Sequence, residues 1–182
     1  MRSLVLALAA TTALVLVAGH LTDQHAAGGA SAVTLSGPVT GAAPTVGKPA
    51  PDFTATAVDG TPVSLSSFRG RAVWLTFGAS WCAACRAEAP DIEAAYRRTQ
   101  ADGVVVLAVS ISESTADVRG FADRAGLTFP QVADPDTRIA SAYRVGGIPA
   151  HFFIDRHGVL RSMRTGSLSP DGMDGALVEI SR

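Results

Sequence analysis

The chain has 182 residues, of which 47% are apolar and 17% charged, and its 15 basic residues against 16 acidic ones give a net charge of -1. This length predicts one domain with additional segments, and the apolar share excludes a wholly disordered chain. Because there is no excess of positive charge, binding to nucleic acid is not expected. Two cysteines, Cys82 and Cys85, are too few for a disulfide-rich scaffold or, alone, for a four-ligand zinc site.

The N-terminus carries an uncharged, mostly apolar run of 16 residues, Leu4 to Gly19, behind the single positive charge of Arg2. A membrane-spanning helix needs roughly 20 residues, so the run is intermediate between an uncleaved anchor and the core of a signal peptide. A buried core helix is the remaining alternative. We expect a signal anchor or signal peptide over residues 1–22, a flexible linker over 23–44 and the folded domain over 45–182. The domain is then expected outside the cytoplasm, held at the cell membrane by a single N-terminal anchor, or secreted if the segment is cleaved.

Strands and helices alternate along the folded part. The expected strands are 52–58, 61–65, 72–77, 104–109, 151–154 and 159–163, and the expected helices are 82–99, 115–125, 136–143 and 170–180. Asp59-Gly60 is a hairpin turn signal between the first two strands, and the apolar run 72–77 is typical of a strand covered on both faces. The pattern predicts an α/β fold in which helices flank a mixed central sheet, with an N-terminal hairpin.

The strongest chemical signal is Trp81-Cys82-Ala83-Ala84-Cys85, which follows the expected buried strand and opens a helix. A helix N-terminus offers free N–H groups and the positive end of a dipole, so Cys82 is expected there as an exposed attacking thiol with a lowered pKa. Cys85 lies in the first turn and can resolve a mixed disulfide. The alternatives are a metal-binding pair, which would need two more ligands, or two structural thiols.

Together with other stretches, this motif resembles the thioredoxin superfamily, and more closely the membrane-tethered TlpA/ResA-type thiol–disulfide oxidoreductases of bacteria. The resemblance covers about Val46 to Arg182. It is carried by Gly47–Phe53, Leu65–Gly70, Trp81–Cys85, Glu88-Ala89-Pro90, Gly147-Ile148-Pro149 and His151–Asp155. It implies a thioredoxin-like fold with a central strand–helix insertion near 104–132. Ala84 departs from the pattern, because many relatives have Pro before the second cysteine.

Glu88 stands one helical turn after Cys85, so it is expected on the same side of the helix. A carboxylate there can exchange the proton of Cys85, a role that the resemblance also implies. Thioredoxin itself uses an acidic residue six positions before the first cysteine, where this chain has Thr76, which cannot titrate. We expect Glu88 to be exposed, and the alternative is an ordinary solvated helix carboxylate.

Ile148-Pro149 precedes an apolar strand, and the resemblance implies a cis peptide packed against the disulfide. Because proline cannot donate to a sheet, the Ile148 backbone is left free to pair with an incoming chain. Trp81 would offer that partner an apolar surface. His151 is expected on the strand, with an approach to the site or copper binding as alternatives.

The resemblance implies an exported enzyme that reduces disulfides in extracytoplasmic proteins, for example in cytochrome c maturation. Its expected partners are exported protein thiols or disulfides and a membrane electron donor, and its only redox group is the Cys82–Cys85 disulfide.

A disulfide-forming oxidase is the main alternative, because cysteine spacing does not set the direction of electron flow. A peroxiredoxin-type peroxidase resembles a Pro-x-x-x-Thr/Ser-x-x-Cys pattern, and this chain has Leu75 and Ala79 at the first two positions. Two further alternatives are a copper carrier, a group that resembles a Cys-x-x-x-Cys pattern, and a tethered interaction domain.

Overall fold

The computed structural model describes residues 34–35 and 43–182, so the expected signal segment 1–22 and most of the linker 23–44 lie outside the described residues. The chain divides into two units, residues 1–30 and 31–182, and only the second contains described residues. Within the described ranges, no helix has both the length and the apolar character needed to cross a membrane.

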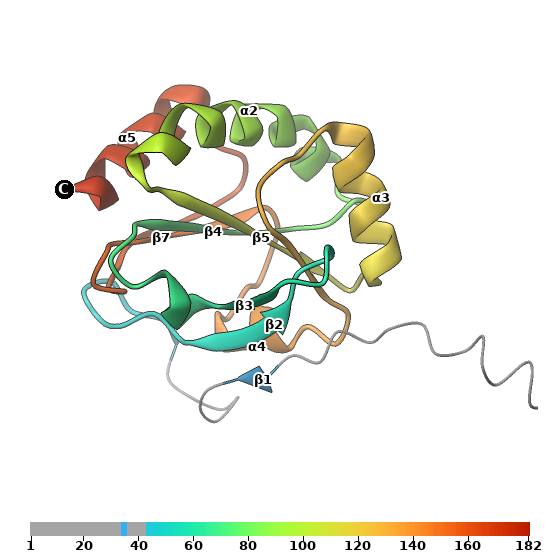
Figure 1. Ribbon diagram of the computed structural model, residues 1–182, viewed down its shortest axis with the longest axis horizontal. Coiled ribbons are helices and arrows are strands. Elements are labelled where there is room, and N and C mark those ends of the chain that lie inside the picture. Colours follow the sequence, from blue (N-terminus) through green and yellow to red (C-terminus); the bar gives the residue numbers. More distant parts are fainter. Residues whose placement is uncertain (1–33, 36–42) are drawn as a thin grey trace, which may run out of the picture. The chain divides into compact units, whose positions relative to one another are not determined.

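A five-stranded sheet in the order β6-β5-β4-β7-β8 lies at the centre of the domain (Figure 1). The strands are β4 (Val73–Gly78), β5 (Val105–Ile111), β6 (Gln131–Asp134), β7 (Ala150–Ile154) and β8 (Leu160–Thr165). β4, β5 and β6 are parallel, whereas β7 runs antiparallel to both β4 and β8. The predicted mixed sheet is confirmed, and the apolar run forms its middle strand because that strand is covered on both faces.

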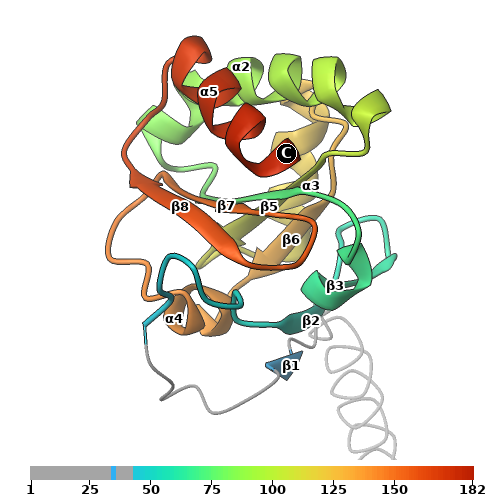
Figure 2. The same cartoon turned by 90° about the vertical axis from the view of Figure 1, so that its left-hand side faces the viewer.

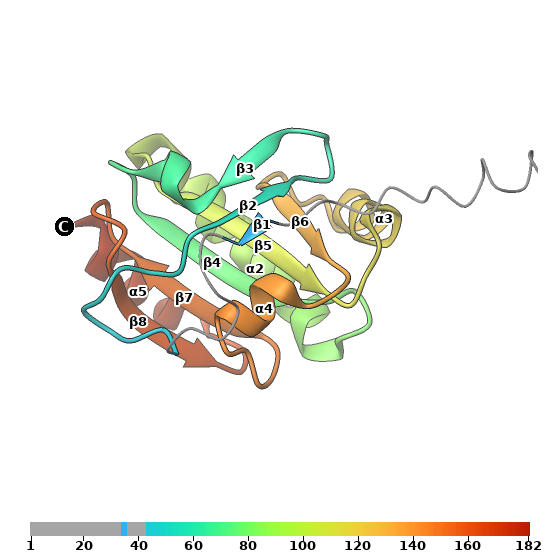
Figure 3. The ribbon, with the colours of Figure 1, turned by 90° about the horizontal axis from the view of Figure 1, so that it is seen from below.

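Helices and a second, smaller sheet cover the two faces of the central sheet. Helices α2 (Ala83–Thr99) and α5 (Pro170–Ser181) pack side by side on one face, and α3 (Thr115–Ala125) packs against β6 (Figures 1 and 2). The other face carries the short α4 (Arg138–Ala142) and an antiparallel sheet (Figure 3). The strands of that sheet are β1 (Thr34–Leu35), β2 (Phe53–Thr56) and β3 (Pro62–Ser64), and a 3₁₀ helix (Leu65–Phe68) follows them. The predicted hairpin is the β2–β3 pair.

Alternation along β4 and β7 divides their side chains between two cores. The members that face the core shared with β2, β3 and α4 are Val73, Leu75, Phe77, Ala150, Phe152 and Ile154. Trp74 and Phe153 lie in the other core, under α2 and α5. Because successive strand residues point to opposite faces, Thr76 and His151 also belong to the α2 and α5 side. Two polar side chains thus lie in an otherwise apolar layer.

Several elements differ from the sequence expectation. β6 was not expected as a separate strand, and β1 lies in the stretch expected as linker. α4 begins at Arg138 and not at 136, because Thr137 has a left-handed backbone with φ 54°. The Asp134 carboxylate then accepts the N–H groups of Arg138 and Ala140 at 2.8 and 2.9 Å, and so fixes the helix start two residues later than predicted.

Candidate active site

Cys82 is the N-cap of α2, which begins at Ala83 a few residues after β4 ends. Its backbone is extended (φ -79°, ψ 114°), and its Sγ accepts the N–H of Cys85 at 3.2 Å. This is the contact that a capping side chain makes, so the expected helix start is confirmed. Cys82 and Cys85 are joined by a disulfide, with their Cα atoms 5.3 Å apart. A thiolate at the Cys82 position would accept the same N–H at the positive end of the helix dipole.

The expected exposure of Cys82 is wrong for this disulfide-bonded structure. Cys82 is only 9% exposed, whereas Cys85 is half-buried and Trp81 is 58% exposed. The reason is the segment before β7, which brings the Ile148 carbonyl oxygen to 4.0 Å from the Cys82 Sγ. Gly78 lies against the pair, since a Cβ on it would come into van der Waals contact with the Cys85 Sγ at 3.4 Å.

The Ile148–Pro149 peptide bond is cis, which confirms the expected isomer. The Pro149 carbonyl accepts the N–H of Gly166 at 2.8 Å and so belongs to the sheet, while the Ile148 carbonyl faces Cys82. Ile148 thus contacts Cys82 from the segment before β7, and the exposed Trp81 directly precedes Cys82 in the chain. Their part in binding a substrate stays a prediction.

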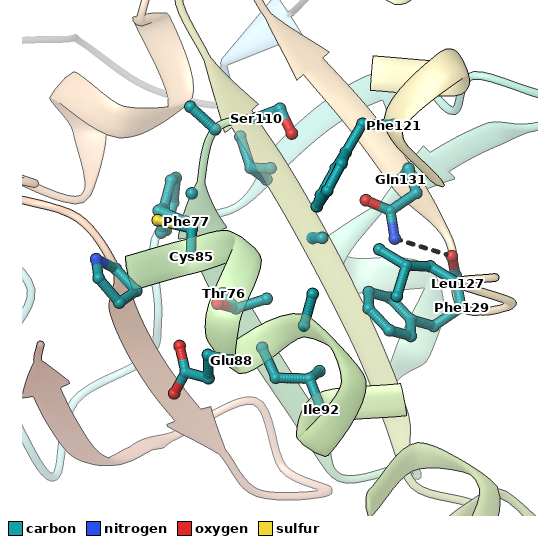
Figure 4. A pocket seen from close by; sticks show the side chains of 16 residues that line it. Thr76, Phe77, Cys85, Glu88, Ile92, Ser110, Phe121, Leu127, Phe129 and Gln131 are labelled. Atoms are coloured by element: carbon teal, nitrogen blue, oxygen red, sulfur yellow. Dashed lines mark hydrogen bonds between the residues drawn. The ribbon is translucent and has the colours of Figure 1, made fainter. Parts of the chain in front are cut away.

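A pocket lies behind Cys85, between α2, α3 and the sheet (Figure 4). Its wall is mainly apolar, with Ile92 from α2, Phe121 from α3, and Leu127 and Phe129 from the loop before β6. Glu88 and Cys85 line the same pocket from successive turns of α2 (Figure 4). Among the described residues, no three His, Cys, Asp or Glu side chains gather as metal ligands would.

Glu88 is buried, with 3% of its surface exposed, so the expectation of an exposed or solvated carboxylate is wrong. The Leu168 N–H, in the loop before α5, donates to its Oε1 at 2.6 Å, and the Nε2 atom of His151 lies 3.4 Å from the same oxygen. Burial raises the pKa of Glu88 above its usual value, against the opposing effect of the Leu168 N–H. The carboxyl group next to the cysteine pair is thus protonated more readily than an exposed one.

His151 is fully buried on β7, as expected for a strand residue, but it also contacts Glu88. Its Nδ1 atom lies 3.1 Å from the hydroxyl of Thr76 and 3.3 Å from the indole nitrogen of Trp74. Thr76, opposite His151 in the sheet register, therefore faces this histidine. Burial lowers the pKa of His151 to about 4, so the ring is neutral near pH 7.

Sequence reasoning missed Glu113, which follows β5. Its buried carboxylate accepts the backbone N–H of Ser80 at 2.8 Å and the hydroxyl of the same residue. Arg86 donates to the Ser80 carbonyl at 2.8 Å, so both charged groups hold the turn that leads into Cys82. The sequence did contain a signal for this contact. β4 and β5 are parallel, and residues that follow the carboxyl ends of parallel strands meet at one edge of the sheet.

A helix that begins at a disulfide-bonded Cys-x-x-Cys pair, beside a cis-proline and on a mixed sheet, defines a thioredoxin-like oxidoreductase domain. The AhpC/TSA family model matches residues 46–163. Thiol-disulfide oxidoreductase ResA of Geobacillus kaustophilus is 38% identical over 135 residues, which cover 74% of this chain and 78% of that protein.

Two solved structures agree with this class. A thioredoxin family thiol:disulfide interchange protein from Chlorobium tepidum has a TM-score of 0.69 at 26% identity, over 77% of this chain and 100% of that one. The exposed lipoprotein thioredoxin of Streptococcus pneumoniae has a TM-score of 0.62 at 32% identity, over 70% and 98%. The chain belongs to the AhpC/TSA family and, within it, to the ResA-type thiol–disulfide oxidoreductases. The predicted family, fold and enzyme class are confirmed.

The geometry at the helix start predicts which thiol reacts first after reduction. The Cys85 N–H and the helix dipole favour a Cys82 thiolate, so its pKa should lie below the reference value of about 8.5. We expect iodoacetamide to label Cys82 before Cys85 in the reduced protein at pH 6, as measured by peptide mass spectrometry. Labelling of Cys85 first would contradict the assignment.

Proposed function

We propose that Cys82 is the attacking thiol and Cys85 the resolving thiol of a reductase that acts on disulfides of exported proteins. The observation that carries this proposal is the 3.2 Å hydrogen bond from the Cys85 N–H to the Cys82 Sγ at the start of α2. It supports a stabilised thiolate at the position that an incoming disulfide would meet. The electrons are carried by the cysteine pair itself.

The reaction has two exchange steps. In the first, the Cys82 thiolate forms a bond to one sulfur of the partner disulfide, whose S–S bond breaks and releases a partner thiolate. In the second, Cys85 loses its proton and attacks the Cys82 sulfur, which breaks the mixed disulfide and releases the second partner thiolate. Two electrons pass to the partner, its two thiolates take up two protons, and the Cys82–Cys85 disulfide forms again.

Glu88 is proposed as the group that accepts the proton of Cys85 in the second step. Both side chains line one pocket on successive turns of α2, and burial raises the pKa of Glu88 toward that of a thiol. Trp81, Ile148 and Pro149 are proposed to bind the partner chain: Trp81 by its exposed apolar surface, and Ile148 by its backbone beside Cys82.

Export and a membrane anchor complete the proposal. The support is the uncharged run Leu4 to Gly19 behind Arg2, together with the exposed lipoprotein thioredoxin named among the similar structures. In this setting the reductase receives electrons from a membrane donor and passes them to exported thiol proteins, apocytochrome c being one example. If the segment is cleaved, the domain is secreted.

The direction of electron flow distinguishes the reductase from the alternative, an oxidase of the same fold. Equilibration with glutathione buffers would give the reduction potential of the Cys82–Cys85 pair. A reductase should lie near thioredoxin, at about -270 mV, whereas an oxidase should approach DsbA, at about -120 mV. A value close to that of DsbA would overturn the reductase proposal and leave the thiol chemistry intact.

The role of Glu88 predicts a change in the pH profile of resolution. Only the ionised carboxylate accepts a proton, so the wild-type rate should rise as pH passes upward through the raised pKa of Glu88. Glu88→Gln should lose this rise and slow resolution by up to about 10²-fold, the low end for a general base. Stopped-flow kinetics with a peptide disulfide measures both profiles.

Glu179→Gln is the matched control, because Glu179 is an exposed glutamate of α5. Its profile should coincide with that of the wild type. Superimposable profiles of the wild type and Glu88→Gln would reduce Glu88 to a structural residue.

A further inference from the structure

His151 is a buried titratable residue for which the exchange reaction has no direct use. Its side chain has no exposed surface, and β7 places it between β4 and β8, under α2 and α5. A buried polar group without partners destabilises the folded state. Each of its two ring nitrogens therefore needs a hydrogen-bond partner.

The first nitrogen, Nδ1, identifies the tautomer. The indole N–H of Trp74, which can only donate, points to Nδ1 at 3.3 Å, and the Thr76 hydroxyl lies 3.1 Å from the same atom. Nδ1 must then be the acceptor, and the proton of the neutral ring must be on Nε2. A second proton on Nδ1 would face the Trp74 N–H, which agrees with the lowered pKa of His151.

The second nitrogen, Nε2, faces Glu88. It lies 3.4 Å from the Glu88 Oε1, the oxygen that also accepts the Leu168 N–H at 2.6 Å. Within the described part of the chain, His151 Nε2 and Glu88 Oε2 are the two buried side-chain atoms that have no hydrogen-bond partner. The donor and the carboxyl group are therefore adjacent but not joined by a well-aligned bond in the disulfide form.

We propose that His151 is a positioning residue for Glu88: its Nε2–H, fixed by Trp74, donates to Oε1 when the carboxylate is ionised. The Leu168 N–H and the His151 Nε2–H would then hold Oε1 from two sides and stabilise the charge. Oε2 stays free to exchange a proton with Cys85. The inference rests on the proposed function of Glu88, because it explains how a buried carboxyl group can ionise there.

The other groups around the pair do not replace this donor. On α2, the charge of Asp91 acts on Glu88 and disfavours its ionisation. On β8, Arg164 is opposite His151 in the register, but its side chain is exposed and donates to the Met163 carbonyl. The Gly166 backbone also acts on His151 in the direction that favours a ring N–H, so it is the alternative acceptor for the ring proton.

The test measures Glu88 in the oxidised protein, where the cysteines do not titrate. The side-chain carboxyl ¹³C signal of Glu88, assigned by its loss in Glu88→Gln, gives the midpoint of ionisation by NMR. His151→Leu removes the donor and should raise the midpoint by about one pH unit, the effect of one hydrogen bond to a charge. His151→Gln keeps an N–H donor and should restore a midpoint near that of the wild type.

Ile180→Val is the control for repacking, because Ile180 is fully buried in the same core, on α5. It should leave the midpoint unchanged. An unchanged or lowered midpoint in His151→Leu would overturn the proposal and favour Gly166 as the acceptor.

A second measurement needs no variant, so it tests the proposed proton position even if His151→Leu does not fold. The ring ¹⁵N signals of His151 in the wild type at pH 7 should report a proton on Nε2 and none on Nδ1. The opposite tautomer, or a doubly protonated ring, would overturn the proposal. The result is independent of the proposed role of Glu88, because that role fails only if the pH profile of exchange does not depend on Glu88.

Discussion

The hydrogen bond from the Cys85 N–H to the Cys82 sulfur is the constraint on which the site depends. It makes one cysteine the cap of α2 and places the other in the first turn, so that both sulfurs lie at the positive end of the helix dipole. The surrounding residues hold this geometry. Gly78 lies against Cys85, and Glu113 fixes Ser80 just before the motif.

A second constraint follows from alternation in the central strands. The side chains that point toward α2 and α5 include polar ones, and each must find a partner because the layer is otherwise apolar. Trp74, Thr76 and His151 meet one another across β4 and β7, and the imidazole in turn faces Glu88. The carboxyl group proposed for proton exchange is thus connected to the sheet and not to solvent.

Local features of the site could be predicted from the sequence. The Cys-x-x-Cys motif after a buried strand indicates the helix start, and the spacing of Glu88 indicates its side of α2, because both depend on neighbouring residues only. Burial could not be predicted in this way. Glu88 is covered by a loop that donates from Leu168, 80 residues later, and Cys82 is covered by Ile148, 66 residues later.

The same distinction between local patterns and tertiary contacts applies to the elements of the fold. The strand 72–77 and the turn Asp59-Gly60 have strong local patterns, and the structure contains the corresponding β4 and β2–β3 hairpin. The four-residue β6 has no such pattern, since its pairing with β5 and its end at Asp134 depend on tertiary contacts. Glu113 likewise meets Ser80 only because two parallel strands end at one edge.

Trapping of the mixed disulfide tests the central claim, that Cys82 is the thiol which meets the partner. Reduced Cys85→Ser and Cys82→Ser proteins would each be mixed with insulin, whose disulfides serve as the probe. The products would be separated without reductant and mapped by mass spectrometry. The account predicts an insulin chain linked to Cys82 in Cys85→Ser and little adduct in Cys82→Ser. An adduct that forms faster through Cys85 in Cys82→Ser would contradict it.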